Sequence, residues 1–565
     1  MGRNILKSSL ENASFNIIFQ ILFRCVTFVL NAFIIRHVGQ DVLGIMNVRL
    51  LLLESTILFL SREPLLKACL TDTKSHNWAQ VINQVWLSVP LSGLLSIALV
   101  YVWLNILSST EDLYLEQYRT GCYAIAFSCI IDQITQCLVL VAQSYCFIRL
   151  KIICETLYIT VRTITFVVLV LHYPTHAINA FSIAQVTSAI FLCSLYYGFF
   201  YWYIKSFNKL KDQQKKDDVV TLHNQVQIAL FKDMQDFKFR SILDFFPGYM
   251  ENKEKLFNKD LTVLSISFAK QSVVKQVLTE GERYVMTISP VLTFSEQSTY
   301  DIVNNLGSLA ARFIFRPIEE SAYFYFTQMI KRDQPIGKQD QQLISEAVTV
   351  LSQLCKVVSS IGLIVIVFGN AYSHTLLYLY GGNTLIATKL PTILLKCHCI
   401  AVLLLAVNGV TECYVFATMN SKQLDRYNYI MVIFSITFLL VSYIFTTFFG
   451  PVGFIFANCI NMAARIMHSV YFITNKYKES SYRPLQGLRP GIKFISVLIV
   501  SGIITNISEK YYLLDVNMRA VVLHVGIGGI CFFLTAATWI FENKSLTKVG
   551  IDQYRRRVSL KSDEC

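Results

Sequence analysis

The sequence is short of charged residues. Only 15% of the 565 residues are Asp, Glu, Lys or Arg and 54% are hydrophobic, whereas a soluble protein carries roughly 25% charged residues. Apolar stretches of about 20 residues recur along almost the whole chain, and each is long enough to cross a hydrocarbon core of roughly 30 Å. The period-two alternation of a transmembrane β-strand is missing. The sequence therefore predicts an all-α polytopic membrane protein, with membrane lipids as its surroundings.

Motifs of enzyme chemistry are also missing. No P-loop, G-x-S-x-G or H-E-x-x-H pattern occurs, so an ATP-driven pump and a membrane hydrolase lack their characteristic residues. The 15 cysteines include no C-x-x-C pair, and the Cys-His-Cys run at 397–399 is a poor metal site on a helix. A lipid-glycosyltransferase is the main enzymatic alternative, but the acidic loop 111–116 is too short to supply its carboxylates. We expect a protein that is not an enzyme and has no cofactor or metal.

Acidic residues are fewer than basic ones, 37 against 50, which gives a net charge of +13. In a soluble protein this excess would suggest nucleic-acid binding. Here the basic residues lie in the loops on one side of the predicted spans, which is the distribution that membrane insertion produces. No nucleic-acid partner is expected.

Hydropathy predicts about fourteen transmembrane helices. Leaving out 205–260, the even-numbered connections and both tails hold about 23 Lys and Arg, and the outer loops hold about five, so both termini and 205–260 should be cytosolic. The first span is expected to be a signal anchor, and Gly450-Pro451 should form a tight turn. The predicted spans are 15–38, 42–61, 80–106, 119–142, 152–172, 178–204, 261–289, 298–328, 343–370, 391–419, 427–449, 451–474, 491–508 and 519–541.

The two halves of the chain look related. Residues 134–137 (ITQC) and 410–413 (VTEC) occupy matching places in the fourth and tenth spans, at an offset of 410 − 134 = 276 residues. Equal topology on both sides then indicates a parallel repeat. The expected domains are a six-helix lobe at 1–204, a charged, solvated linker at 205–260, a second six-helix lobe at 261–474, and two additional helices with a basic cytosolic tail at 475–565.

Polar residues inside the spans fall in stripes with the period of an α-helix. A charge at the bilayer centre costs at least roughly 2.5 kcal/mol, so it needs a partner or a wet cavity. For any single residue, pairing across helices to hold the bundle together is an equally good explanation. The clearest stripe is in the first span, and others lie in the seventh, eighth and twelfth: Asn16, Gln20, Arg24, Thr27 and Asn31, then 271–283, 301–319 and 458–468.

Basic residues outnumber acidic ones in the middle of the spans. A surplus of buried cations implies a polyanionic guest, and arginine suits phosphate because its fork makes two charge-assisted hydrogen bonds. A drug or cation antiporter fits badly, since its cavity should be acidic. A pyrophosphate carrying sugars would meet both the arginines and the amide side chains.

Several motifs resemble the Rft-type family, which belongs to the superfamily of multidrug, oligosaccharidyl-lipid and polysaccharide exporters. The resemblance covers nearly the whole chain. It implies two pseudo-symmetric six-helix lobes around a central cavity, in a protein of the endoplasmic reticulum and the N-glycosylation pathway. The motifs are FR at 23–24, NAFIIR at 31–36, NVRL at 47–50, FLSRE at 59–63, TEGERYVM at 279–286 and YVFATMN at 414–420.

The resemblance implies a translocator that moves dolichyl-pyrophosphate-linked Man5GlcNAc2 from the cytosolic to the luminal leaflet. The alternative is a non-transporting accessory factor or chaperone that binds the same lipid or a glycosyltransferase of the pathway. The residues expected to hold the pyrophosphate are Arg24, Arg49, Arg62, Arg283, Arg312 and Arg465. Those expected to bind the sugars are Gln20, Asn31, Asn305 and Asn461.

Overall fold

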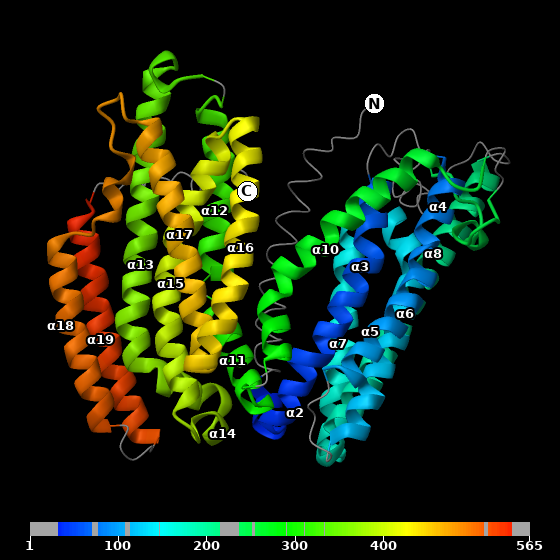
Figure 1. Ribbon diagram of the computed structural model, residues 1–565, viewed down its shortest axis with the longest axis horizontal. Coiled ribbons are helices and arrows are strands. Elements are labelled where there is room, and N and C mark those ends of the chain that lie inside the picture. The colour runs from blue at the N-terminus through cyan, green and yellow to red at the C-terminus, as the bar shows by residue number, and fades with distance from the viewer. Residues whose placement is uncertain are drawn as a thin grey trace. The chain divides into compact units, whose positions relative to one another are not determined.

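The computed structural model describes most of the chain, and the regular secondary structure of the described residues consists of helices (Figure 1). Most of the first predicted span lies outside the described part, and so do three predicted site residues, Gln20, Arg24 and Asn31. The described ranges are 32–70, 77–107, 114–145, 147–214, 237–250, 255–289, 291–309, 311–332, 334–512 and 518–544.

The chain divides into two compact units. Unit 1 comprises residues 1–288 and 293–298. In it α6 and α7 both pack on α8, and α10 packs along α3. Its helices are α2 (Gln40–Gly44), the π-helical η1 (Ile45–Leu50), α3 (Leu51–Leu70), α4 (Trp78–Trp86), α5 (Ser88–Asn105), α6 (Leu115–Ser144), α7 (Ile148–His172), η3 (Pro174–His176), α8 (Ala177–Gln214), η4 (Ile242–Phe245) and α10 (Lys259–Ile288).

Unit 2 comprises residues 289–292 and 299–565. Here α15 is the central helix, because α12, α13 and α17 all pack on it. Gly450, at φ 57°, ends α16 just before Pro451, so the predicted turn is confirmed. The elements are α11 (Phe294–Gly307, which crosses the division between the units), the π-helical η5 (Ala311–Phe315), α12 (Arg316–Met329), η6 (Ile336–Lys338), α13 (Gln341–Gly381), α14 (Asn383–Ile386), α15 (Leu390–Thr418), α16 (Ser421–Phe449), α17 (Val452–Lys476), η7 (Pro484–Leu488), α18 (Ile492–Tyr512) and α19 (Met518–Glu542).

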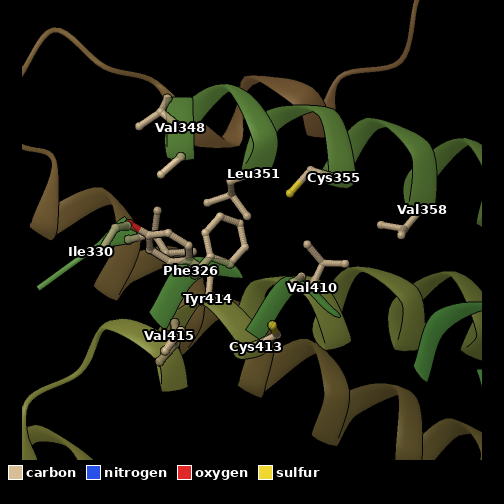
Figure 2. Packing of buried hydrophobic residues seen from close by; sticks show 14 of the residues in the cluster. Phe326, Ile330, Val348, Leu351, Cys355, Val358, Val410, Cys413, Tyr414 and Val415 are labelled. Atoms are coloured by element: carbon tan, nitrogen blue, oxygen red, sulfur yellow. The ribbon is translucent and has the colours of Figure 1, made fainter. Parts of the chain in front are cut away.

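The core of unit 2 lies where α12, α13 and α15 meet. Figure 2 shows Phe326 of α12 between Leu351 of α13 and Tyr414 of α15. The rings of Phe326 and Tyr414 pack edge to face, with centroids 5.0 Å apart. This aromatic contact joins α12 to α15 at one end of the bundle.

Ten helices in the described residues are long and apolar enough to cross a membrane. They correspond to ten of the predicted spans. Three further predicted spans, 261–289, 298–328 and 451–474, are helical as α10, as α11 to α12 and as α17, but they are not among the ten. These three carry the polar stripes, which lower their hydropathy.

The expectation of a solvated linker is wrong for three aromatic residues of 237–250, whereas others in the same segment, such as Lys238 and Tyr249, are exposed. Phe237, Phe239 and Phe245 are buried in one hydrophobic cluster with Trp78 of α4 and Phe200 of α8. The prediction of a solvated segment rested on its mixed charges. The aromatic residues are scattered among these charges and form no apolar run.

The seventh predicted span was expected to open the C-terminal lobe. In the structure this segment, α10, belongs to unit 1 and packs along α3. The contact explains why, since polar side chains on both helices hydrogen-bond one another along its length. The lobe boundaries at 204, 260 and 474 remain predictions.

Candidate functional site

Polar side chains line the contact between α3 and α10 in unit 1. The Thr56 hydroxyl lies 2.7 Å from the Tyr284 hydroxyl, and the buried Gln276 amide donates to both at 3.5 and 3.4 Å. Further along, the Lys275 ammonium lies 3.6 Å from the Glu63 carboxylate. We call these five residues the α3–α10 polar seam. Lipid offers no hydrogen-bond partners, so polar groups at such a depth bind one another.

Arg49 lies in η1, beside the far end of α10. Its side chain is only 2% exposed. The guanidinium donates to the Leu107 carbonyl and, at 3.4 Å, to the Thr287 carbonyl, and it lies 4.9 Å from the centre of the Phe294 ring. The Trp103 indole in turn donates to the Arg49 carbonyl at 3.2 Å. Carbonyl dipoles and an aromatic face therefore stabilise this cation, which ties the ends of α5 and α10 to η1.

Arg62 and Arg283 are more accessible than Arg49. The Arg62 side chain is 37% exposed, and its Nη1 lies 3.4 Å from the Asp132 carboxylate of α6. The Arg283 side chain is 29% exposed and pairs at 3.1 Å with Glu280, one turn earlier on α10. The guanidinium of Arg62 has five N–H donors in a fixed fork, more than one carboxylate can accept. Arg62 can therefore hold Asp132 and bind an anion as well.

Two other mid-span charges of unit 1 neutralise each other. Arg162 Nη1 lies 3.9 Å from Glu54 Oε2, and the buried Gln185 of α8 joins them. Its amide nitrogen donates to Glu54 at 2.7 Å, and its oxygen accepts from Arg162 at 3.2 Å. The same nitrogen lies 3.2 Å from the Tyr158 hydroxyl. Arg162 and Glu54 therefore pair with each other across helices, and such pairing holds the bundle together.

Unit 2 has its own buried polar cluster around Glu412 of α15. Arg465 Nη2 of α17 lies 2.5 Å from Glu412 Oε2, Asn408 donates to the same oxygen at 3.0 Å, and the Tyr427 hydroxyl of α16 donates to Oε1 at 2.7 Å. We call these four residues the Glu412 cluster. The Arg465 side chain is 25% exposed and that of Glu412 is 8% exposed, so the arginine is the accessible member of the pair.

The remaining predicted residues are placed separately. Asn305 of α11 is exposed and donates to Asp301 at 3.2 Å. Asn461 lies one turn before Arg465 on α17, and its buried Oδ1 has no hydrogen-bond partner among the described residues. Arg312 lies in η5. The structure thus distributes the predicted site over both units rather than gathering it on one helix.

Within each unit, these groups have the chemistry to bind anions and hydroxyl groups. In the described ranges no three His, Cys, Asp or Glu side chains come together to hold a metal ion. A guanidinium that pairs with a carboxylate can bind a phosphate in addition to that carboxylate or in its place, because both anions match the same fork of N–H donors. Amide side chains such as those of Asn305 and Asn461 can donate to and accept from sugar hydroxyls.

Comparison with known proteins decides the family. Residues 8–552 match the family described as Rft protein. The chain belongs to this family. Among its relatives is the Man(5)GlcNAc(2)-PP-dolichol translocation protein RFT1 of Drosophila melanogaster, 49% identical over 565 residues that cover 99% of this chain and 100% of the relative. The Mus musculus protein of the same name is 37% identical and covers 99% of each chain. These relatives are named as translocation proteins, not as enzymes.

A solved structure of another protein has a fold similar to that of this chain. The lipid II flippase MurJ, in an inward closed conformation, is similar at a TM-score of 0.54, with 94% of this chain and 99% of that chain covered. At 12% identity the likeness concerns the fold alone. The predicted all-α polytopic membrane fold is confirmed.

Sequence reasoning missed several residues of these networks. Asn408 and Gln136 could have been found, because each lies four residues from a mid-span carboxylate and so shares its helix face. Gln185 and Tyr284 could not, since they bond to Glu54 and Thr56, 131 and 228 residues away. Such pairings arise only once the helices pack.

Proposed function

We propose that this chain moves dolichyl-pyrophosphate-linked Man5GlcNAc2 from the cytosolic to the luminal leaflet of the endoplasmic reticulum membrane, for protein N-glycosylation. The observation that carries the proposal is the 49% identity, over 99% of the chain, to a protein named for translocation of this lipid. The polytopic fold and the partly exposed arginines support it. Both are what an intramembrane carrier of a polyanionic head group requires.

In this proposal the pyrophosphate is held by arginines whose side chains an anion can reach. Arg62, Arg283 and Arg465 are 37%, 29% and 25% exposed. Arg49 is enclosed and would contribute only after the groups around it separate. The sugars would bond to amide groups. The full proposed set remains Arg24, Arg49, Arg62, Arg283, Arg312 and Arg465 for the pyrophosphate and Gln20, Asn31, Asn305 and Asn461 for the sugars.

The decisive experiment is reconstitution of the purified full-length protein in liposomes with labelled glycolipid, scoring leaflet exchange. Exchange should exceed that of protein-free liposomes. Arg62→Gln should slow it about tenfold, because a lost charge-assisted hydrogen bond costs roughly 1.5–3 kcal/mol. Arg489→Gln, which removes an exposed arginine outside the helices, is the control and should leave the rate unchanged. Protein-free rates in all samples would sink the proposal.

The alternative is an accessory factor or chaperone for lipid-linked oligosaccharide assembly, with glycosyltransferases of the same pathway as partners. One observation favours it: protein groups hold Arg49, Arg62, Arg283 and Arg465. In the same liposomes this function would give glycolipid binding without exchange. The two functions are therefore separable in one experiment.

Arg24 gives a test in cells, because its stripe in the first span is the cleanest. If it binds the substrate, Arg24→Ala should lower N-glycosylation while the protein still accumulates. If it serves structure, its loss strands a buried carboxylate at a cost of roughly 3–5 kcal/mol, and the protein should be degraded. Normal glycosylation at normal abundance would exclude this residue from substrate binding.

The proposed orientation places both termini and 205–260 in the cytosol. A C-terminal tag should be digested by protease in sealed microsomes, and a protected tag would refute the orientation. The sequon at 506–508 should be luminal and unmodified. Asn506 lies inside α18, where its side chain donates to the Gly502 carbonyl at 2.7 Å and accepts from Asn370 at 3.2 Å.

A further inference from the structure

One end of unit 2, its upper end in Figure 1, contains a polar cavity of about 950 Å³. At this end α12, α15 and α17 finish, while α13 and α16 begin. The lining comes from the α12–α13 connection with the first residue of α13, from the start of α16, and from the end of α17 with the loop that follows it. The predicted topology places all three connections on the cytosolic side. None of the ten proposed glycolipid-binding residues lines this cavity.

The base of the cavity is rigid. Ile336 and Phe472 line it. Ile336 belongs to the hydrophobic core that Figure 2 shows in part, and Phe472 packs against this core. Beneath them the hydroxyls of Tyr414 and Tyr477 lie 2.6 Å apart in a buried hydrogen bond. The cavity therefore rests on packed helix ends instead of on a loop alone.

The lining carries three cations and one carboxylate. The cations are Arg332, Lys476 and Lys478, and the carboxylate is that of Glu479. No carboxylate of the described residues lies within ion-pair distance of any of the three cations. The cavity lining therefore has a surplus of positive charge, and none of its three cations is in an ion pair with a described residue.

Two of the cations are held in place by backbone and side-chain oxygens. Arg332 Nε donates to the Ala417 carbonyl at 3.1 Å and its Nη2 to the Tyr323 hydroxyl at 3.2 Å. Lys476 Nζ donates to the Thr418 carbonyl at 2.7 Å. Capping of the α15 C-terminus explains these contacts. It uses only some of the five donors of arginine and the three of lysine, and it does not involve Lys478.

Two features favour an anion beside these groups. The N-terminus of the 29-residue helix α16, capped by Asn420, borders the cavity and adds the positive end of its dipole. Lys476 lies past the predicted span 451–474, and burial lowers the pKa of its ammonium to about 8. Burial therefore penalises this charge, and a bound anion would relieve that penalty.

We infer that this cavity binds the phosphate group of an anionic ligand, a lipid head group or a soluble phosphate ester, at the cytosolic end of unit 2. A guanidinium fork, two ammonium groups and a helix N-terminus match the several oxygens of phosphate better than a single carboxylate. The inference is independent of the proposed translocation, because it uses none of the same residues.

The test uses the purified full-length protein in detergent. Binding of inorganic pyrophosphate is measured by calorimetry, and binding of dioctanoyl phosphatidic acid and dioctanoyl phosphatidylcholine by native mass spectrometry. Arg332→Gln and Lys478→Gln should each raise the Kd for the phosphate probes about five- to tenfold. Lys389→Gln, which removes an exposed charge just before the opposite end of α15, is the matched control. It should leave the Kd for the phosphate probes unchanged.

The probes distinguish the source of the phosphate. Binding of phosphatidic acid but not phosphatidylcholine identifies a lipid head group, whereas binding of pyrophosphate alone identifies a soluble phosphate ester. Lys478 is exposed, so its variant decides the question if Arg332→Gln unfolds at a lower temperature than the wild type. Failure of every phosphate probe to bind, or equal affinities in Lys478→Gln, Lys389→Gln and the wild type, would overturn the inference.

Discussion

Helices α6 and α15 carry the same kind of polar pair at matching positions, with acid and amide exchanged. In α6, Gln136 donates to Asp132 at 3.0 Å. In α15, Asn408 donates to Glu412 at 3.0 Å. The offsets agree with the repeat, since 408 − 132 = 276 and 412 − 136 = 276. Both pairs bond an arginine, but it comes from α3 in unit 1 and from α17 in unit 2.

The exchange moves the negative charge by one helical turn and changes what it binds. Asp132 is 16% exposed and lies 3.4 Å from Arg62. Glu412 is 8% exposed, lies 2.5 Å from Arg465 and also accepts from Tyr427. In the predicted repeat, the hydrogen-bond pair is kept while the helix that supplies its arginine differs. The more buried, more fully bonded carboxylate should be the harder one to remove.

Glu412→Gln should have the largest effect. It leaves Arg465 without its counter-charge, and breaking a buried ion pair from one side lowers the free energy of unfolding by roughly 3–5 kcal/mol. Thermal unfolding of the purified protein in detergent measures this. Adding Arg465→Gln should restore part of the loss, and an unchanged melting temperature in the single variant would contradict the difference between the units.

Gly409→Ala should come next. A Cβ at this position would lie 1.7 Å from Glu319 Oε1 of α12. This atom ends a flexible side chain that can turn aside, so the cost should lie at the low end of overpacking, about 1 kcal/mol. The matching position in α6 is Gln133, which donates to Ser61 of α3 at 3.1 Å. The control is Gly198→Ala in α8, which meets nothing within 4 Å and should stabilise by roughly 0.5–1 kcal/mol. Equal melting temperatures in the two variants would show that the close approach is unimportant.

Asp132→Asn should cost less than Glu412→Gln, about 1 kcal/mol. The reason is that Arg62 is 37% exposed, so solvent screens much of the pair. The same thermal measurement applies to both variants. A loss as large as that of Glu412→Gln would mean that exposure of the arginine does not set the cost.

The smallest effect is expected from the double variant Asn408→Asp with Glu412→Gln, which gives α15 the order of acid and amide found in α6. The cluster keeps one carboxylate for Arg465, so the loss relative to the wild type should stay within roughly 1 kcal/mol. The two positions are in contact and their effects should not be additive. A double variant as unstable as Glu412→Gln alone would show that the carboxylate works only at position 412.

Local sequence patterns predict some of this structure and not the rest. Apolar length predicts the helices, and it places Asp132 and Glu412 as charges in the middle of two of them. The partners from other helices are not predictable in this way, because nothing near Thr56 in the sequence indicates Tyr284. The burial of three aromatic residues in 237–250 was missed for a related reason: they pack against α4 and α8, which lie elsewhere along the chain.

The polarity of α12 has a consequence for biosynthesis. Its Glu319 approaches Gly409 of α15, and its Glu319 carbonyl accepts from the Cys413 thiol at 3.2 Å, yet α15 begins 390 − 329 = 61 residues after α12 ends. At about 5–20 residues per second the ribosome needs roughly 3–12 s to supply that partner. By contrast, α10 and α17 emerge after the helices they pack on, α3 and α15. During that interval α12 lacks the α15 contacts of Glu319, so the final packing of α12 must wait until α15 has been made.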